Sequence, residues 1–314
     1  MSFQWYGLVR RTVRIRFISG RTEPRFTITV SEGFMTHFCT GYAKKPFATL
    51  AQTYPGVEAY PSKDFRVEWG PVFHRGRLDG KARILLIGQD PGPHENVLRR
   101  ILVGEAGRRV QGFLGKLGIT KRYVLINALL YSVYGAAGAK YVKKSAVLEY
   151  RNRWIDGILS FGRIEAVITA GGMAKTAWDE YVKTRPDASA LPAGNIIHPT
   201  FPESAGGTRQ EMAANTKKML AQWNESLLQL FPAVRHRDVA VKAVRLYGDA
   251  FVEEDKVDIP AFDLPAGVPG WMYDNDGWAS RGFPSKLPSP KTEEDRVLLK
   301  RSVLVVKIPK TVIS

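Results

Sequence analysis

Four short apolar runs mark the middle of the chain. They are "ARILLIG", "YVLINAL", "IEAVITAGG" and "GNIIHP", and hydrophobic residues follow one another in each with little interruption. Such runs are typical of parallel strands buried on both faces of a sheet, whereas strands with one exposed face alternate between apolar and polar residues. The pattern therefore predicts four buried, parallel strands.

Helical segments separate these runs. They cover about residues 97–117, 141–161 and 173–183, and a last helix over about 209–230 follows the fourth run. Strands that alternate with helices form an α/β sheet with helices on both faces. We therefore predict a three-layer α/β/α sandwich with a central, mainly four-stranded parallel sheet, in a domain of residues 70–230.

The two flanks of this domain have a different pattern. Residues 12–30 alternate apolar positions with arginine or threonine around "SGRTEP", which predicts a β-hairpin in an N-terminal extension, residues 1–69. In the C-terminal extension, residues 231–314, "DVAVKAVRLY" and "SVLVVKIPKTVI" are typical of strands, and a segment rich in Pro, Gly and aromatic residues separates them. These β-rich additions are candidates for one small β unit or for a homodimer contact, and the sequence leaves both open.

Composition narrows the class of partner. The chain has 314 residues, of which 44% are hydrophobic, so it can bury a core. Lys and Arg number 46 against 30 Asp and Glu, a formal net charge of +16. This excess of cations favours a polyanionic partner such as a nucleic acid, because neutralised phosphates release counterions. A basic enzyme without a nucleic-acid partner is the alternative interpretation.

Cysteine usage excludes several kinds of site. Cys39 is the only cysteine, so no intramolecular disulfide, cysteine-based zinc site or iron–sulfur cluster can form. A reducing cytoplasm is the simplest setting, nucleoid-associated if the protein is bacterial. The sequence has neither the apolar core of a signal peptide nor an apolar run long enough for a membrane span.

Polar residues stand at the ends of three predicted strands. Gln89 and Asp90 follow the first, Asn127 lies inside the second, and His198 follows the fourth. Ligands of such sheets bind at the carboxyl ends of the strands. An acid, an amide and an imidazole at one edge can therefore converge on a planar, polar ligand, although each residue alone is also compatible with a structural role.

These segments resemble the uracil-DNA glycosylase superfamily. "GQDPGP" is similar to motif A of its family 1, Gly-Gln-Asp-Pro-Tyr-His; "VLINALLYSV" is similar to the uracil-reading strand, and "HPTFPES" to motif B. In contrast, "LVGEAGRRVQGFLGKLGI" and "VITAGGMAKTAW" resemble family 4, whose members carry an iron–sulfur cluster. The resemblance covers about residues 71–230 and neither flank.

The resemblance implies an activity and a role for each residue. The protein would flip uracil out of single- or double-stranded DNA and hydrolyse its N-glycosidic bond, which initiates base excision repair, without a metal or cofactor. Asp90 would activate the attacking water and stabilise the charge on the sugar. His198 and the Gln89 backbone amide would donate hydrogen bonds to the departing base, and Asn127 would read its edge.

Several positions depart from the family patterns. Gly92 stands where family 1 has a tyrosine that excludes thymine, which predicts tolerance of 5-substituted uracils or other deaminated bases. The alternative is that this glycine only suits a tight turn. Leu102 stands where family 4 has a phenylalanine that stacks on the base. The cluster cysteines of family 4 are absent, so we expect something else, with the termini as candidates, to hold the loops that the cluster would hold.

The predicted DNA contacts rest on weaker similarity. The segment after His-Pro lacks the intercalating leucine loop of family 1, and Phe201 is the candidate wedge, with Arg209 near a phosphate. His94 lies one residue from the position of the motif A histidine. A surface loop without contact to DNA is the alternative for this segment.

Two other functions remain open. One is a catalytically inactive nucleic-acid-binding protein with the same fold, which would have no need of a water-activating acid beside a base-reading amide. The other is an α/β enzyme that acts on a small nucleoside or phosphate ligand. The segment "GQDPGP" has neither the GxGxxG pattern nor the lysine of a P-loop that such a ligand would require.

Overall fold

The structure is a computed structural model that describes residues 42, 44–272, 277–282, 292 and 303–308. The chain divides into two units, Met1–Thr36 and His37–Ser314, and all the described residues belong to the second. The hairpin predicted over residues 12–30 lies outside the described residues. Among the described helices, none has the length and apolarity that crossing a membrane requires.

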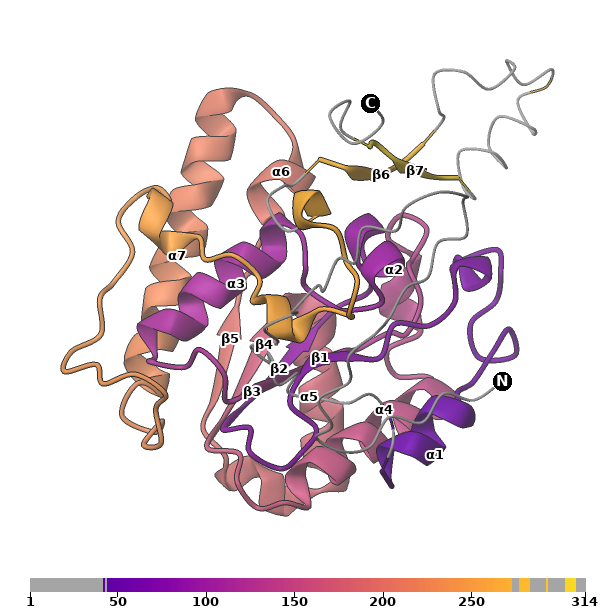
Figure 1. Cartoon of the computed structure of the whole chain (residues 1–314), viewed down its shortest axis with the longest axis horizontal. Helices are drawn as coiled ribbons and strands as arrows, with labels where there is room; N and C mark the ends of the chain where they lie inside the picture. Colours follow the sequence, from indigo (N-terminus) through magenta and orange to yellow (C-terminus); the bar gives the residue numbers. More distant parts are fainter. Residues whose placement is uncertain (1–41, 43, 273–276, 283–291, 293–302, 309–314) are drawn as a thin grey trace, which may run out of the picture. The chain divides into compact units, whose positions relative to one another are not determined.

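A five-stranded sheet forms the centre of the structure (Figure 1). Its strand order is β1-β3-β2-β4-β5. Strands β2, β3, β4 and β5 are parallel to one another, and β1, at one edge, is antiparallel to its neighbour β3. The strands are β1 His74–Gly76, β2 Ile84–Gly88, β3 Tyr123–Asn127, β4 Ala166–Ala170 and β5 Ala193–Ile196. The predicted four-stranded parallel sheet is confirmed.

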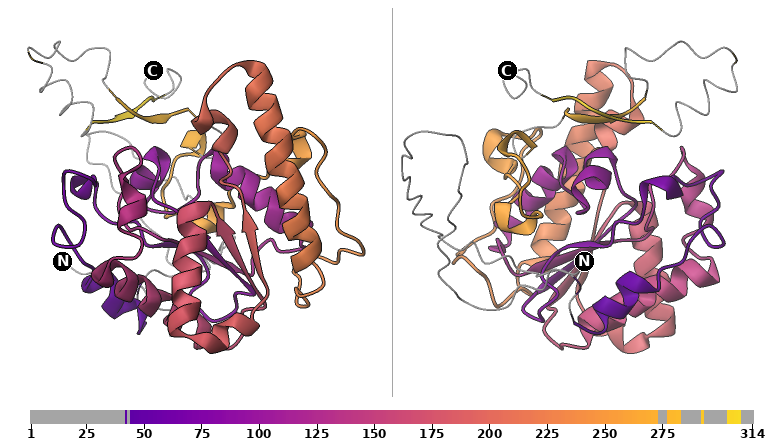
Figure 2. Two further views of the ribbon diagram at one scale, coloured as in Figure 1. Left: turned by 180° about the vertical axis from the view of Figure 1, so that it is seen from behind. Right: turned by 45° about the vertical axis from the view of Figure 1, so that its right-hand side comes forward.

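The helices cover both faces of this sheet (Figures 1 and 2). Successive residues of a strand point to opposite faces, so Leu85 and Ile87 join one buried cluster while Ile84 and Leu86 join the other. The first cluster includes residues of α1, α4 and α5, and the second residues of α3 and α7. The α-helices are α1 Phe47–Gln52, α2 Pro93–Leu98, α3 Glu105–Lys116, α4 Ser145–Leu159, α5 Gly172–Thr184, α6 Phe201–Ala205 and α7 Arg209–Leu230.

The last helix has the predicted bounds, and one predicted helix is wrong. Thr208 caps α7 by accepting from the Glu211 backbone N–H, while the Glu211 carboxylate accepts from that of Thr208. The single helix predicted over residues 97–117 is instead two helices, α2 and α3. Arg99 and Leu102 between them adopt left-handed φ values of 56° and 52°, which end the first helix.

The C-terminal segment after α7 runs over α3 and α7 largely without regular structure. The strand predicted over residues 238–247 is wrong: Asn224 of α7 bonds both the N–H and the C=O of Tyr247, and Tyr247 packs on Trp223. A helix side chain thus satisfies backbone groups that a neighbouring strand would otherwise satisfy. The segment contains the 3₁₀ turns η4 Glu253–Asp255, η5 Ala261–Asp263 and η6 Gly270–Met272.

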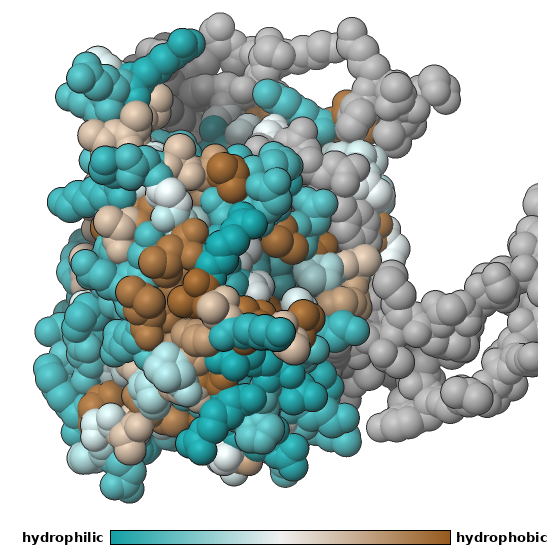
Figure 3. Space-filling view, turned by 90° about the vertical axis from the view of Figure 1, so that its left-hand side faces the viewer, coloured by the Kyte–Doolittle hydropathy of each residue, from teal (hydrophilic) through white to brown (hydrophobic). Residues whose placement is uncertain are grey.

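The surface on the side of α7 is mostly hydrophilic and encloses a smaller apolar area (Figure 3). Large apolar residues that are exposed in α7 and the C-terminal segment are Leu228, Val239, Leu246, Val252 and Val257. Val239 belongs to the alternating segment that was predicted as a strand, and its side chain is exposed. Alternation favours a strand only where the apolar side chains can pack on a core, and the Val239 side chain does not.

A short ribbon follows farther along the chain. Strands β6, Ala279–Arg281, and β7, Leu304–Val306, pair antiparallel, so the strand predicted in "SVLVVKIPKTVI" is confirmed over three residues. Among the described residues its partner is β6, which lies against α2. The ribbon and the C-terminal segment therefore pack on the α/β sandwich near the carboxyl end of β2.

Candidate active site

The predicted site residues gather at the carboxyl edge of the parallel sheet. A pocket of about 870 Å³ opens there, between the ends of β2, β3 and β5. The predicted residues that line it are Gln89, Asp90, Gly92, His94, Leu102, Asn127, His198 and Phe201. Arg209 does not line it and is exposed at the start of α7.

Asp90 follows β2 and is half-buried in the pocket. Its Oδ2 accepts a hydrogen bond of 3.1 Å from the Val133 backbone N–H, which fixes the carboxylate. Burial raises the pKa of Asp90, while the positive charges of Arg281 and Arg66 act in the opposite direction. A carboxylate that is fixed by one oxygen can present the other to a water molecule or to a developing positive charge.

Asn127 ends β3, opposite Gly88 of β2. Its side chain is buried, and its Nδ2 has no hydrogen-bond partner among the described residues. A Cβ on Gly88 would lie 2.4 Å from Asn127 Oδ1, so this position needs glycine to leave room for the amide. A buried donor that lacks a protein partner inside a pocket indicates a ligand that supplies an acceptor.

His198 follows β5 and is held from α7. Gln222 accepts from the Ile197 N–H at 2.8 Å, and Trp223 Nε1 donates to the Ile197 C=O at 2.9 Å, which fixes the residue before His198. Burial lowers the pKa of His198 to about 4, so the ring is neutral at pH 7. The Thr200 backbone N–H lies 3.4 Å from Nδ1. We therefore assign the ring proton to Nε2, which makes this nitrogen a donor.

Arg109 of α3 braces the loop that carries His198. It donates to the Pro199 C=O at 2.6 Å and to both carboxylate oxygens of Glu203, at 2.7 and 3.1 Å. It also pairs with Glu105 one turn away at 3.0 Å. A bidentate guanidinium pair of this kind fixes orientation as well as distance. The segment that is similar to motif B is thus tied to α3.

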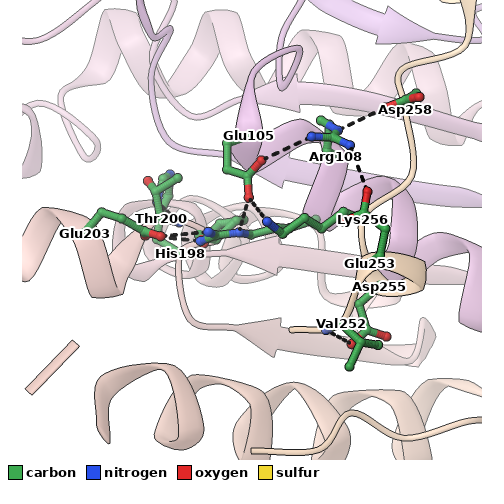
Figure 4. Close-up of polar contacts among 12 residues, drawn as sticks. Glu105, Arg108, His198, Thr200, Glu203, Val252, Glu253, Asp255, Lys256 and Asp258 are labelled. Atoms are coloured by element: carbon green, nitrogen blue, oxygen red, sulfur yellow. Dashed lines mark hydrogen bonds and ion pairs between the residues drawn. The ribbon is translucent and has the colours of Figure 1, made fainter. Parts of the chain in front are cut away.

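The C-terminal segment extends this network (Figure 4). Figure 4 shows Glu105 of α3 between Arg108 and Lys256, and the Lys256 ammonium lies 3.1 Å from the Glu105 carboxylate. Arg108 in turn pairs with Asp258 at 3.0 Å. Residues from the extension therefore hold α3, the helix that braces the His198 loop.

The side chain of Gln89 has a structural role. Its Oε1 accepts from the Met173 N–H at 3.2 Å, at the start of α5. Gly171, with φ of 97°, lies so close that a Cβ there would be 2.8 Å from Gln89 Cδ. The amide oxygen therefore links the end of β2 to the start of α5, the helix that follows β4.

Glu95 is a pocket residue that the sequence analysis missed. Its carboxylate accepts hydrogen bonds from the backbone N–H groups of Gly92 and Leu102, and so joins the start of α2 to the turn between α2 and α3. Burial raises its pKa to about 7, and the neighbouring charge of Asp90 adds to the shift. The available signal was its place three residues after Gly92, the N-cap of α2, where glutamate closes a capping box.

Replacing Glu95 with glutamine is expected to change how stability depends on pH. Between its ordinary pKa of 4.5 and about 7, the folded protein holds more protons on Glu95 than the unfolded chain does. Glu95 therefore lowers the free energy of unfolding progressively as the pH rises through that window. Urea unfolding at several pH values is the measurement. The wild-type minus variant difference should decrease as the pH rises, and parallel curves would contradict the assignment.

Three further predicted residues have packing roles. Leu102 is buried and lines the pocket from the strained turn between α2 and α3. Phe201 begins α6, is half-buried and packs against the core that includes α7. His94 Nε2 accepts from the Ala279 N–H at 3.3 Å, and its ring stands edge-on to Trp278. His94 therefore contacts the C-terminal segment.

The ribbon supplies a wall of the pocket that the sequence analysis did not predict. Ala279, Ser280 and Arg281 of β6 line the pocket together with the strand-end residues. Arg281 Nη2 donates to the Pro91 C=O at 3.2 Å and to Ser132 Oγ at 2.8 Å. No motif in the sequence marks these residues, because their place depends on packing against α2 rather than on local pattern.

The site has no arrangement for a metal among the described residues. In that part of the chain, no three His, Cys, Asp or Glu residues lie close enough together to hold an ion. The chemistry that the pocket offers comes instead from one acid, one neutral imidazole and one amide, at the carboxyl ends of strands β2, β5 and β3 of the same sheet.

Comparison with known proteins agrees with this geometry. The family model described as "Uracil DNA glycosylase superfamily" matches residues 75–230, from β1 to the last residue of α7. Among curated proteins, none matches the chain. The matched segment contains the three strand-end residues and the helices that hold them. Through residues 75–230, the chain belongs to the uracil DNA glycosylase superfamily.

Proposed function

We propose that the protein is a monofunctional DNA glycosylase that removes uracil from DNA by hydrolysing the N-glycosidic bond, the first step of base excision repair. One observation carries the proposal: Asp90, Asn127 and His198 line one pocket, and the Asn127 amide nitrogen is buried there without a protein partner. Superfamily membership supports a glycosylase-type activity and DNA as the partner.

In the proposed reaction, the acid stabilises positive charge on the sugar and the imidazole stabilises negative charge on the base. As the bond between uracil and the sugar breaks, positive charge develops on the sugar and negative charge on the base. The Asp90 carboxylate first stabilises this positive sugar; it then accepts a proton from the water whose oxygen bonds to the sugar carbon, while uracil leaves as an anion. His198 is neutral and carries its proton on Nε2. This N–H donates a hydrogen bond to uracil O2, where negative charge develops.

Asn127 selects the base in this proposal. Its Nδ2 donates to uracil O4, and its Oδ1 accepts from N3–H. Cytosine presents a donor and an acceptor in the reverse positions, so an amide fixed against Gly88 discriminates against it. The base must leave the duplex to reach a pocket at the sheet edge. The net charge of +16 supports binding to the strand from which it leaves.

An excision assay tests the proposal. Single-stranded and duplex oligonucleotides that contain one uracil are incubated with the protein, and abasic sites are then cleaved with alkali. Cleavage at the uracil is the expected result. Tight binding without cleavage would favour an inactive nucleic-acid-binding protein, and neither binding nor cleavage would favour an enzyme that acts on a small ligand.

Gly92 is the proposed reason for a broader range of bases. Its φ of −83° is accessible to any residue, so the backbone there does not require glycine. A Cβ would make only an ordinary contact, 3.4 Å from Glu95 Oε2. The absence of a side chain at this lining position therefore leaves space beside the base that a larger residue would fill.

Replacing Gly92 with tyrosine is expected to narrow the substrate range. The excision rate for 5-hydroxymethyluracil should fall about ten-fold or more relative to uracil, since a steric clash with one substituent costs at least ~1.4 kcal/mol. The measurement is the ratio of single-turnover rates on the two bases. The control, Gly92→Ala, adds a Cβ without a ring and should leave the ratio nearly unchanged. An unchanged ratio in the tyrosine variant would exclude Gly92 as the gate.

A further inference from the structure

We propose that Arg281, on a ribbon outside the matched segment 75–230, is a substrate-positioning residue that binds a DNA backbone phosphate beside the flipped nucleotide. The inference rests on the proposed function, because it takes DNA as the ligand of the pocket. It adds a residue from the C-terminal extension to a site that otherwise consists of strand ends and loops of the glycosylase domain.

The charge balance of the pocket is the first argument. Among the described residues that line the pocket, Arg281 is the only lysine or arginine, whereas Asp90 and Glu95 supply carboxyl groups; a third, Glu105, is already paired with Arg109 and Lys256. A strand of DNA that enters this pocket brings further negative charge. A cation at the rim offsets the repulsion between its phosphates and these carboxylates.

The hydrogen-bond donors that Arg281 retains are the second argument. Its Nη2 makes both hydrogen bonds of the side chain, to the Pro91 C=O and to Ser132 Oγ. Both acceptors are neutral, and within the described part of the chain no carboxylate lies within ion-pair distance of the guanidinium. The side chain is exposed, so Nε and Nη1 can reach a ligand. A guanidinium that is oriented by neutral acceptors and holds no carboxylate in a close ion pair can still bind a phosphate through its remaining N–H groups.

Other arginines close to the site already bind protein groups. Arg109 pairs with Glu203 and Glu105, as described above. Arg66 donates to the Val133 C=O and lies 4.0 Å from the centre of the Tyr134 ring. Arg99 donates to the Trp69 C=O at 2.7 Å and to the Pro71 C=O. Arg281 is therefore the guanidinium in this region that both lines the pocket and retains donors for a ligand.

The test measures DNA binding rather than excision, so its result is independent of the proposed reaction. Dissociation constants are measured over a series of salt concentrations, for a duplex that carries a tetrahydrofuran abasic analogue. The variants are Arg281→Gln and Arg281→Lys. Arg153→Gln is the matched control, because Arg153 is exposed on α4, does not line the pocket and carries the same charge.

Arg281→Gln is expected to weaken binding several-fold at low salt and to reduce the slope of log K against log salt by about 0.9, the contribution of one phosphate contact. Arg281→Lys should keep most of that slope, and Arg153→Gln should keep all of it. A residue that only tied the ribbon to Pro91 would alter thermal stability but not the slope. An unchanged slope in Arg281→Gln would overturn the proposal.

A second arm locates the contact. The charged linkages that flank the abasic analogue are replaced one at a time by neutral methylphosphonates. In the wild type, one replacement should cost several-fold in affinity, and the same replacement should cost nothing further in Arg281→Gln. Equal losses in both proteins at every linkage would overturn the proposal. Normal binding behaviour combined with no excision of uracil would refute the proposed activity and leave the phosphate contact standing.

Discussion

Replacing Asp90 with asparagine is expected to reduce the single-turnover rate of uracil excision by about 10²- to 10⁴-fold, the usual contribution of a positioned general base. Asparagine has nearly the same shape, and its Oδ1 can still accept from the Val133 N–H that fixes the wild-type carboxylate. The change therefore removes the charge and the basic oxygen and leaves the packing in place. Alkaline cleavage of a uracil-containing oligonucleotide, followed over time, measures the rate.

Binding and folding serve as controls for this variant. The affinity for duplex DNA should not fall, because a carboxylate beside the strand is replaced by a neutral group. The unfolding temperature should stay within a few degrees of the wild-type value. A second variant, His198→Ala, removes the donor to the departing base and should cost about 10²- to 10³-fold. Wild-type excision rates in Asp90→Asn would refute the proposed catalytic role.

Replacing Gly112 with alanine is expected to destabilise the protein by about 1–3 kcal/mol, the usual cost of overpacking. Gly112 lies in the middle of α3, and a Cβ there would be 1.9 Å from the backbone oxygen of Asp255. Backbone cannot give way as a flexible side chain can. The C-terminal segment would have to move off α3, which would also disturb the pair between Lys116 and Asp255, 2.7 Å apart and nearly buried.

Gly115 in the same helix provides a matched control. A Cβ at Gly115 would meet nothing within 4 Å, so Gly115→Ala should stabilise the helix by roughly 0.5–1 kcal/mol. Urea unfolding of the two variants measures both effects. The same sign for both changes would show that α3 does not contact the C-terminal segment as closely as the structure indicates.

The sheet and the core of the site could be predicted from the sequence. Continuous apolar runs identified the parallel strands, and parallel strands bring their carboxyl ends to one edge. The strand assignment therefore predicted that the side chains at these strand ends, Asp90, Asn127 and His198, lie close together. The bounds of α7 were equally accessible, because Thr208 and Glu211 form a capping box just before an apolar pattern.

Other features depend on contacts that no local pattern encodes. Arg99 and Leu102 favour helices, so nothing marked them as the break between α2 and α3. Their left-handed conformations accompany the hydrogen bond from Leu102 to Glu95, seven residues away. Arg281 is farther still from the strand ends in sequence and enters the pocket only because β6 lies against α2. Long-range packing of this kind also replaced the strand predicted around Tyr247.

The buried pair between Arg75 and Asp263 makes the stability of the matched segment depend on the C-terminal extension. Arg75 lies in β1, at the start of the segment that matches the family, and Asp263 lies in the C-terminal segment; both side chains are fully buried, 3.1 Å apart. An arginine buried without its partner typically costs about 3–5 kcal/mol. The segment that matches the family and the C-terminal extension therefore depend on each other for stability, because each contributes one partner of this buried pair.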